Sequence, residues 1–288
     1  RKIQQLQTAD LKAIDRAADR LLNAERPMIM TGGGVILSGA FKELQAVAEF
    51  LVAPVVSTFK GKGGFSETHY LSLGPIGMHG HIEANKLVIE SDVLLAAGAR
   101  FSDRSVGKWD EFGNEMTIIH ADIDPSEIGK NKNADIGLIG DIKTTLSLLL
   151  AAMEKKAQKR QSEYEWIKRV NEIKDIWRSK PLPAPREITG PRLLKKMREI
   201  LPNECLVTTE VGQHQMWAAQ HYKFNKPNRW MTSGGLGTMG YGLPAAVGVQ
   251  VAHPNKLVID IAGEASVLMT MQEMSTAVQY SLPIKIFI

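Results

Sequence analysis

The sequence has one cysteine, few aromatic residues and no long apolar run. A single cysteine excludes an internal disulfide and agrees with a reducing compartment. Cys205 lies in the segment NECLVTTE, so we interpret it as a buried strand residue and not as a catalytic thiol. No apolar stretch approaches the ~20 residues of a membrane-spanning helix, and no signal peptide opens the chain. We therefore expect a cytoplasmic protein, or an organellar one after processing, without a membrane partner.

The sequence also lacks a concentration of one charge. Its formal net charge is only +4, because lysines and arginines are interspersed with acidic residues. The densest basic run, EKKAQKR at residues 154–160, is typical of a solvated helix face, so nucleic acid is not an expected partner. With 288 residues, of which 44% are hydrophobic, the chain has the composition of a globular protein with room for two domains.

Apolar runs alternate with amphipathic segments in the first half of the chain. Each run ends in glycine, a polar residue or an acid, which is typical of parallel strands buried on both faces. Segments 8–24 and 38–51 carry apolar residues at helical spacing, the first with Thr8 or Asp10 as its N-cap. This alternation predicts a doubly wound parallel sheet, with ligands at the carboxyl ends of its strands. The expected strands lie in residues 27–33, 53–59, 92–99, 116–123 and 134–141.

A proline-rich connector precedes a second alternation. A charged helix is expected over residues 162–178, and three prolines within residues 181–185 indicate a domain boundary. The last expected strand runs into the end of the chain, which suggests a domain that is cut short. The second alternation has expected helices at 191–200, after 212, at 242–251 and at 267–280, and expected strands at 205–209, near 230, at 256–262 and at 283–288.

Three glycine-rich segments are candidate cofactor sites. TSGGLGTMGYGLPAA, residues 232–246, suits a backbone pressed against a cofactor, because glycine is needed where φ is positive or a ligand touches the main chain. KLVIDIAGEAS, residues 256–266, indicates a buried strand ending in a Gly-acid-x-Ser turn suited to a metal and a diphosphate. TGGGVILSG, residues 31–39, ends a strand and opens a helix, where the residues alone fit a phosphate site and a helix-packing turn about equally.

Together with EVGQHQMWAAQ at residues 210–220, these segments resemble the acetohydroxyacid synthases, also called acetolactate synthases. The resemblance covers nearly all of the chain and implies an α/β fold with two doubly wound parallel-sheet domains. It assigns residues 1–160 to a Rossmann-like central domain that binds FAD and residues 161–187 to a helix and proline-rich linker. Residues 188–288 are assigned to a thiamine-diphosphate-binding domain truncated at its C-terminus.

For the central domain, the resemblance implies a largely structural FAD bound at the strand ends. Arg100 is suited to neutralise phosphate, and Asp122 to accept hydrogen bonds from ribose or adenine. Taken alone, His79 also fits a loop histidine, and Arg100 with Asp103 fits an ordinary ion pair. The implied FAD-binding residues are Gly32, Gly33, Gly34, Thr58, Phe59, Lys60, Ile76, Gly77, Met78, His79, Gly98, Ala99, Arg100, Asp103, Arg104, Asp122, Ile123 and Asp141.

For the second domain, the resemblance implies bound thiamine diphosphate and Mg²⁺. Met239 matches the bulky residue that holds the cofactor bent, although without the surrounding glycines a core-filling methionine would be the better interpretation. Glu264 stands where the family has a metal-binding aspartate, and the family's partner asparagine falls beyond Ile288. The implied thiamine-diphosphate-binding residues are Val211, Gly212, Gln213, His214, Gly235, Gly237, Met239, Ala265 and Ser266, with Glu264 as the metal ligand.

Catalytic roles are implied for Arg104, Met78 and Met239. A planar guanidinium can hold the carboxylate of a second 2-oxoacid through two parallel hydrogen bonds, which suits Arg104. Asp103 beside it is suited to orient that group, and a surface ion pair is the alternative interpretation.

The implied reaction is the condensation of pyruvate with pyruvate or 2-oxobutyrate, which gives acetolactate or acetohydroxybutyrate for branched-chain amino acids. The implied partners are these 2-oxoacids, further copies in a homodimer or homotetramer, and a small regulatory subunit. The family's cofactor-activating glutamate belongs to an N-terminal domain outside this sequence, so we expect the chain alone to be inactive. Two alternatives stay open: another thiamine-diphosphate enzyme, such as glyoxylate carboligase or pyruvate oxidase, and a noncatalytic cofactor-binding homologue that only Glu264 supports.

Overall fold

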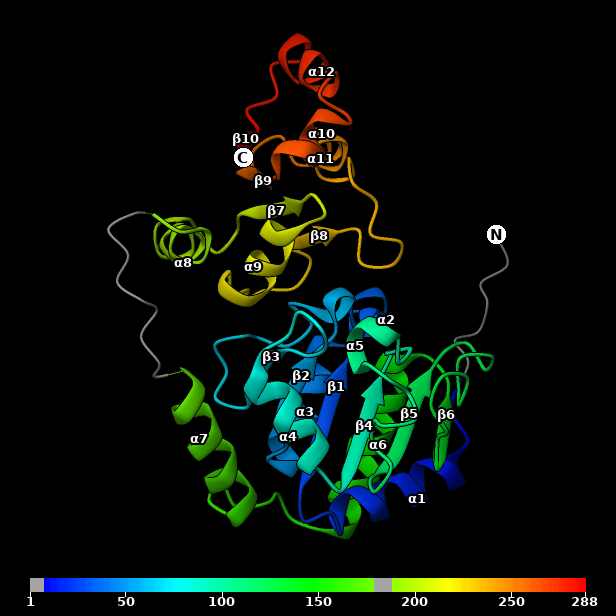
Figure 1. The fold of residues 1–288 in the computed structure, drawn as a ribbon. Coiled ribbons are helices and arrows are strands. Elements are labelled where there is room, and N and C mark those ends of the chain that lie inside the picture. Colours follow the sequence, from blue (N-terminus) through cyan, green and yellow to red (C-terminus); the bar gives the residue numbers. More distant parts are fainter. Residues whose placement is uncertain (1–7, 179–187) are drawn as a thin grey trace. The chain divides into compact units, whose positions relative to one another are not determined.

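The alternation of apolar runs and amphipathic segments folds into two separate parallel sheets (Figure 1). The computed structural model describes residues 8–178 and 188–288, of which the former range belongs to a first compact unit and the latter to a second. The prolines of residues 181–185, predicted to mark the boundary, lie outside the described residues. Within those residues, no helix is both long and apolar enough to cross a membrane.

The first unit has a six-stranded sheet in the order β3-β2-β1-β4-β5-β6. All its neighbouring strands are parallel, and the strand order reverses between β1 and β4, where ligands of such sheets commonly bind. The strands are β1 Pro27–Thr31, β2 Val55–Ser57, β3 Ser72–Pro75, β4 Val93–Ala97, β5 Thr117–Asp122 and β6 Ile136–Ile139. The helices are α1 Leu11–Leu22, α2 Gly33–Ser38, α3 Phe41–Leu51, η1 Phe59–Gly61, α4 Ile82–Glu90, α5 Asp103–Val106, α6 Ile142–Lys156 and α7 Glu165–Arg178.

Helices cover both faces of this sheet. Successive strand residues point to opposite sides, so continuous apolar strands present apolar side chains on both faces. On β1, Ile29 packs into a core with α1, α3 and α6, whereas Met28 and Met30 pack into a second core with α4 and α7. The side chain of Trp166 in α7 donates a hydrogen bond to the carbonyl of Pro27 at 3.1 Å. The first unit is therefore doubly wound, as the sequence predicts.

The second unit has a four-stranded parallel sheet in the order β10-β9-β7-β8. One face packs against α8 and α9 through residues such as Leu194 and Tyr222, and the other packs against α10 through Ala246. The elements are α8 Gly190–Ile200, β7 Leu206–Thr209, α9 Gln213–His221, β8 Trp230–Thr232, α10 Gly242–Ala252, β9 Val258–Ile261, α11 Glu264–Leu268, α12 Glu273–Gln279 and β10 Lys285–Phe287.

The predicted fold class is confirmed, and two predicted elements need correction. The list of expected strands omits β3, which is a short edge strand that contains Gly74 and ends at Pro75, both weak strand formers. The single helix expected over residues 267–280 is two helices, α11 and α12. The turn between them contacts the glycine-rich loop, where the Thr270 hydroxyl donates to the Gly240 carbonyl at 3.3 Å. Asp10 is the N-cap of α1, as expected.

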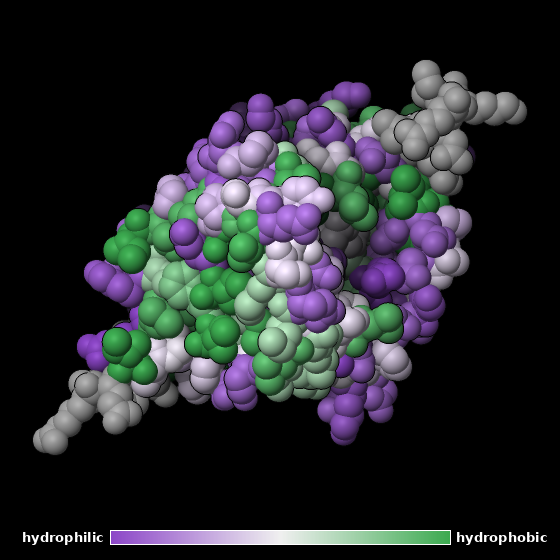
Figure 2. All heavy atoms as spheres, turned by 90° about the horizontal axis from the view of Figure 1, so that it is seen from above, coloured by the Kyte–Doolittle hydropathy of each residue, from purple (hydrophilic) through white to green (hydrophobic). Residues whose placement is uncertain are grey.

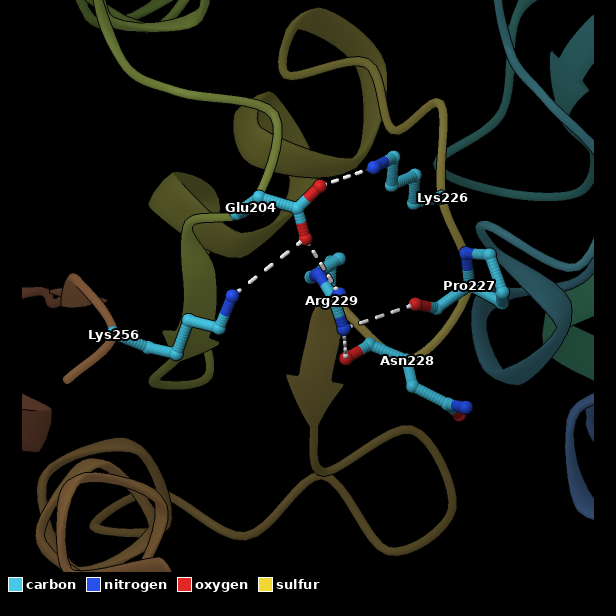
Figure 3. Close-up of polar contacts among 6 residues, drawn as sticks. All are labelled: Glu204, Lys226, Pro227, Asn228, Arg229 and Lys256. Atoms are coloured by element: carbon cyan, nitrogen blue, oxygen red, sulfur yellow. Dashed lines mark hydrogen bonds and ion pairs between the residues drawn. The ribbon is translucent and has the colours of Figure 1, made fainter. Parts of the chain in front are cut away.

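One carboxylate joins the loops that precede β7, β8 and β9, at the amino edge of the second sheet (Figure 3). Glu204 pairs with Lys226 and accepts from Arg229 Nη2 at 2.9 Å, and Lys256 Nζ lies 4.0 Å from it. The hydrogen bonds from Lys226 and Arg229 lower the pKa of Glu204 to about 2. This exposed cluster links three loops that are distant in sequence.

Candidate functional site

A cavity of about 420 Å³ opens at the carboxyl edge of the second sheet. Its walls come from the segments that follow β7, β8 and β9, from the end of β10, and from α8 and α9. Most of the surface is apolar, with contributions from Leu194, Met197 and Trp217. The carboxyl edge of a parallel sheet is the usual place for a ligand, so this cavity is the candidate site of the second unit.

The structure gathers most of the sequence-predicted residues of this unit around the cavity. Gly235 and Gly237 do not line it, although they belong to the same loop as Met239. Gly237 has φ +66°, which explains glycine there by backbone conformation. The predicted residues that line the cavity are Val211, Gly212, Gln213, His214, Met239, Glu264, Ala265 and Ser266.

His214 lies between two glycines at the cavity wall. A Cβ atom at Gly212 would lie 2.9 Å from His214 Cε1, and one at Gly263 would lie 2.7 Å from it, so a side chain at either position would displace the His214 ring. Burial lowers the pKa of His214, which keeps the imidazole neutral near pH 7. Its Nε2 atom is buried and has no hydrogen-bond partner among the described residues. Such an atom needs a polar partner, which a bound ligand would supply.

Glu210 is a buried carboxylate that the sequence analysis did not single out. It directly follows β7, is fully buried, and accepts hydrogen bonds from the backbone N–H groups of Gly240 at 2.7 Å and Leu243 at 3.0 Å. Asp260 on β9 is also fully buried and accepts from the Thr208 hydroxyl at 2.8 Å. An acid at the end of a buried strand, directly before the VGQH segment, is the sequence signal that points to Glu210.

Burial and, to a smaller extent, the charge of Glu210 raise the pKa of Asp260 to about 7, against the hydrogen bond from Thr208. The second carboxyl oxygen of Asp260 is buried without a hydrogen-bond partner among the described residues. Two neighbouring buried carboxyl groups resist simultaneous ionisation. Asp260 therefore keeps its proton to a much higher pH than an exposed aspartate does.

In the first unit, the predicted glycines hold two loops together at the carboxyl edge. A Cβ atom at Gly32 would lie 2.0 Å from the Gly98 carbonyl oxygen, and one at Gly34 would lie 2.7 Å from Gly98 Cα. The Gly34 N–H donates to the Gly98 carbonyl at 3.0 Å. A Cβ atom at Gly33 would instead lie 3.2 Å from Lys60 Cβ. Close main-chain packing thus accounts for Gly32 and Gly34, whereas the closest contact of a side chain at Gly33 would be with a side chain.

Other predicted residues of the first unit meet beside this pair of loops. The Met78 N–H donates to the Arg104 carbonyl at 3.0 Å, and a Cβ atom at Gly77 would lie 2.2 Å from the same oxygen. The His79 ring lies edge-on to Phe59 with centroids 6.1 Å apart. Burial and the charge of Arg104 lower the pKa of His79. A cavity of about 350 Å³ adjoins these segments and is lined by Ile76, Gly77, Met78, Asn85, Ile89, Ser105, Val106, Gly107 and Phe112.

The predicted acidic residues of the first unit have local roles. Asp141 caps α6 by accepting from the Thr144 N–H at 3.0 Å, and Asp122 accepts from the Asp124 N–H at 3.0 Å. The carboxylate of Asp103 accepts from the backbone N–H of Arg104 at 2.8 Å.

No ion pair joins Asp103 to Arg100 or Arg104 within residues 8–178 and 188–288. The ion-pair interpretation is therefore wrong, because no such pair forms in these ranges and one oxygen of Asp103 accepts from the backbone of Arg104. The orienting role of Asp103 stays a prediction.

No group of three histidine, cysteine or acidic side chains gathers as a metal site in the described parts of the chain. Glu264 begins α11, is exposed and lines the cavity beside Ala265. The second unit therefore offers one acidic ligand to a cation in this cavity. The other oxygens would have to come from water or from a bound anion.

Comparison with known proteins assigns both units. Residues 14–149 match the family model of the thiamine pyrophosphate enzyme central domain, and residues 210–288 match that of the C-terminal TPP binding domain. Thiamine pyrophosphate is another name for thiamine diphosphate. The acetolactate synthase large subunit of Parasynechococcus marenigrum (strain WH8102) is 44% identical over 277 residues, which cover 96% of this chain and 44% of that protein.

The acetolactate synthase large subunit of Cyanidium caldarium is 43% identical over 283 residues, which cover 96% of this chain and 48% of that protein. The chain thus spans about half the length of the curated relatives it matches. Two family models, matched in order along the chain, and these extended similarities agree with the two parallel-sheet units. The chain belongs to the thiamine pyrophosphate enzymes and contains sequence of their central and C-terminal domains.

Proposed function

We propose that the whole protein condenses pyruvate with a second 2-oxoacid, giving acetolactate or acetohydroxybutyrate for branched-chain amino acids. The observation that carries this proposal is the cavity of the second unit, where the VGQH segment, Met239 and the Gly-acid-x-Ser turn meet. The similarity to acetolactate synthase large subunits supports the choice of reaction. The alternative is a thiamine-diphosphate enzyme that catalyses another reaction, and analysis of the products would distinguish the two.

Thiamine diphosphate fits this cavity by the chemistry of its walls. The cofactor, when bound, supplies a carbanion that attacks a carbonyl carbon. Val211 to His214 would hold the diphosphate, and His214 Nε2 would gain the hydrogen-bond partner that it lacks. Met239 would support the rings from its apolar side. Glu264 would supply one oxygen ligand to Mg²⁺, with the rest from the diphosphate and water.

The first unit would contribute FAD and the acceptor-binding arginine. Buried hydroxyl oxygens of Thr31 and Ser57, at the carboxyl ends of β1 and β2, have no hydrogen-bond partner within the described residues. Gly33 begins α2, where the lack of a side chain would allow a phosphate to approach the backbone N–H groups of the helix start. Arg104 is exposed, so its guanidinium is accessible to the carboxylate of the second 2-oxoacid.

A homodimer or homotetramer is part of the proposal, with a small regulatory subunit as a further partner and a cytoplasmic or organellar location. Hydrophobic side chains gather on the surface seen in Figure 2. Exposed apolar residues of the second unit include Leu268, Met269, Met271, Val278 and Tyr280, on α11, α12 and their flanks. Large exposed apolar areas commonly mark protein interfaces.

Product analysis with the full-length protein tests the proposed reaction. Purified protein supplied with thiamine diphosphate, Mg²⁺ and FAD should convert pyruvate alone to acetolactate, and pyruvate with 2-oxobutyrate to acetohydroxybutyrate as well. Products of simple decarboxylation or of pyruvate oxidation in place of acetolactate would contradict the proposal.

A further inference from the structure

We propose that Glu210 is a positioning residue that fixes the Met239 loop against the VGQH loop, so that the two cavity walls keep one arrangement. This inference rests on the proposed function only for the identity of the ligand, thiamine diphosphate. Glu210 does not line the cavity itself. It would act through the main chain of two segments that do.

Glu210 is connected to both segments, to one by its own backbone and to the other by hydrogen bonds of its side chain. Its own backbone leads directly into Val211, the first cavity-lining residue after β7. One carboxylate oxygen accepts from the N–H of Gly240, the residue after Met239, at 2.7 Å. The other accepts from the N–H of Leu243, in the first turn of α10, at 3.0 Å. The Glu210 side chain therefore connects two segments of the cavity wall. Glu210 is the neighbour of Val211 in one segment, and its partner Gly240 is the neighbour of Met239 in the other.

The surroundings of the Glu210 side chain suit a carboxylate better than an amide. Both acceptors receive backbone N–H donors, and one donor belongs to the amino end of the eleven-residue helix α10, which stabilises negative charge. Asp260 nearby holds a proton more readily than an exposed aspartate, which relieves repulsion between the two groups. An amide in place of Glu210 has only one acceptor oxygen and would face one N–H group with its NH₂ group.

Glycine at position 242 allows this contact to form. A Cβ atom there would lie 2.5 Å from Asp260 Oδ1 and 2.7 Å from the Glu210 backbone nitrogen. Gly240 adopts φ +86°, which turns its N–H toward a position that other residues rarely reach. The loop is thus shaped to bring its donors to Glu210.

The test compares Glu210→Gln and Glu210→Asp with Thr208→Val in the full-length protein. Thr208 is buried on the same strand and bonds to Asp260, but makes no bond to the Met239 loop, so its variant controls for general destabilisation. Two quantities are measured: hydrogen–deuterium exchange of peptides covering residues 239–243, without cofactor, and calorimetric affinity for thiamine diphosphate with Mg²⁺.

In Glu210→Gln, exchange over residues 239–243 should rise by about tenfold or more, and the dissociation constant for thiamine diphosphate by about tenfold, since one charged hydrogen bond is lost. Glu210→Asp keeps two acceptor oxygens but reaches less far by one methylene, so it should fall between wild type and Gln. Thr208→Val should change the affinity less than about threefold. Unchanged exchange, or an affinity in Glu210→Gln equal to that of Thr208→Val, would overturn the positioning role. A wild-type protein that binds no thiamine diphosphate would overturn the proposed function, whereas the exchange comparison would still decide the role of Glu210.

Discussion

The two edges of the second unit's sheet handle charge in opposite ways. At the amino edge, Glu204 keeps 38% of its side chain exposed and meets three cationic side chains. At the carboxyl edge, Glu210 and Asp260 are fully buried, and one oxygen of Asp260 has no partner in the described structure. Exposed ion pairs contribute little to stability because water screens them, whereas buried carboxyl groups carry a desolvation cost. The comparison teaches that the buried carboxyl groups at the carboxyl edge lower the stability of the fold, whereas the exposed pairs at the amino edge change it little.

The largest expected effect comes from crowding the carboxyl edge. Gly242→Ala would place its Cβ atom 2.5 Å from Asp260 Oδ1 and 2.8 Å from the Thr209 carbonyl carbon. Because backbone atoms cannot move aside, we expect a loss of more than about 3 kcal/mol in the free energy of unfolding. Urea unfolding measures this loss.

Gly248→Ala is the matched control in the same helix, since its Cβ atom would meet nothing within 4 Å. It should stabilise the protein by up to about 1 kcal/mol, as expected for an exposed helix position. Equal effects of the two substitutions would show that the contact at Gly242 is not tight.

Asp260→Asn should change how the stability of the protein depends on pH. The folded-state pKa of Asp260, about 7, exceeds the ordinary aspartate value of 3.8, so the folded state holds this proton more tightly. This group therefore destabilises the fold progressively as pH rises from about 4 to about 7. Compared with wild type, the Asn variant should gain up to about 4 kcal/mol of stability between pH 4 and pH 8, since each unit of pKa shift is worth about 1.4 kcal/mol. Parallel pH profiles of the two proteins in urea unfolding would contradict the assignment.

Arg104 extends the comparison to the carboxyl edge of the first unit, where a charge is exposed. Arg104→Lys should leave the thermal midpoint nearly unchanged, because the guanidinium makes no ion pair within the described residues. In the full-length enzyme, it should weaken use of the acceptor by about 1.5 to 3 kcal/mol, since lysine lacks the bidentate geometry. Pyruvate decarboxylation should continue, with more acetaldehyde released. Unchanged carboligation would show that another residue holds the acceptor.

Glu204→Gln should have the smallest effect. The folded-state pKa of about 2 lies below the ordinary glutamate value of 4.5, so the charge of Glu204 stabilises the fold above about pH 4.5 and loses that effect toward pH 2. At pH 7 the variant should melt slightly lower than wild type, and added salt should shrink the difference. A difference in melting temperature that is as large at pH 2 as at pH 7 would contradict the ion-pair account.

The sequence was sufficient to predict both parallel sheets and most elements of this edge. Apolar runs followed by glycine or acid mark strands β1, β4 and β9, because strands buried on both faces need continuous apolar residues. The VGQH segment and the Gly-acid-x-Ser turn could be placed near one cavity, because both directly follow buried strands of one sheet.

The role of Glu210 could not be predicted in this way. Its partners Gly240 and Leu243 lie 30 and 33 residues further along the chain, and only the folded loop brings their N–H groups to it. The packing of Gly32 on Gly98 is hidden for the same reason, because a glycine required by another backbone looks like one required by a ligand. The orientation of Asp103 also depends on local backbone geometry that spacing does not reveal.

The most direct test of the central claim asks whether thiamine diphosphate binds in the carboxyl-edge cavity. Trp217 lines that cavity and serves as a reporter. Titration of the full-length protein with thiamine diphosphate and Mg²⁺ should give a saturable change in tryptophan fluorescence that is absent in Trp217→Phe. No change in the wild type, or the same change in Trp217→Phe, would contradict binding at this site.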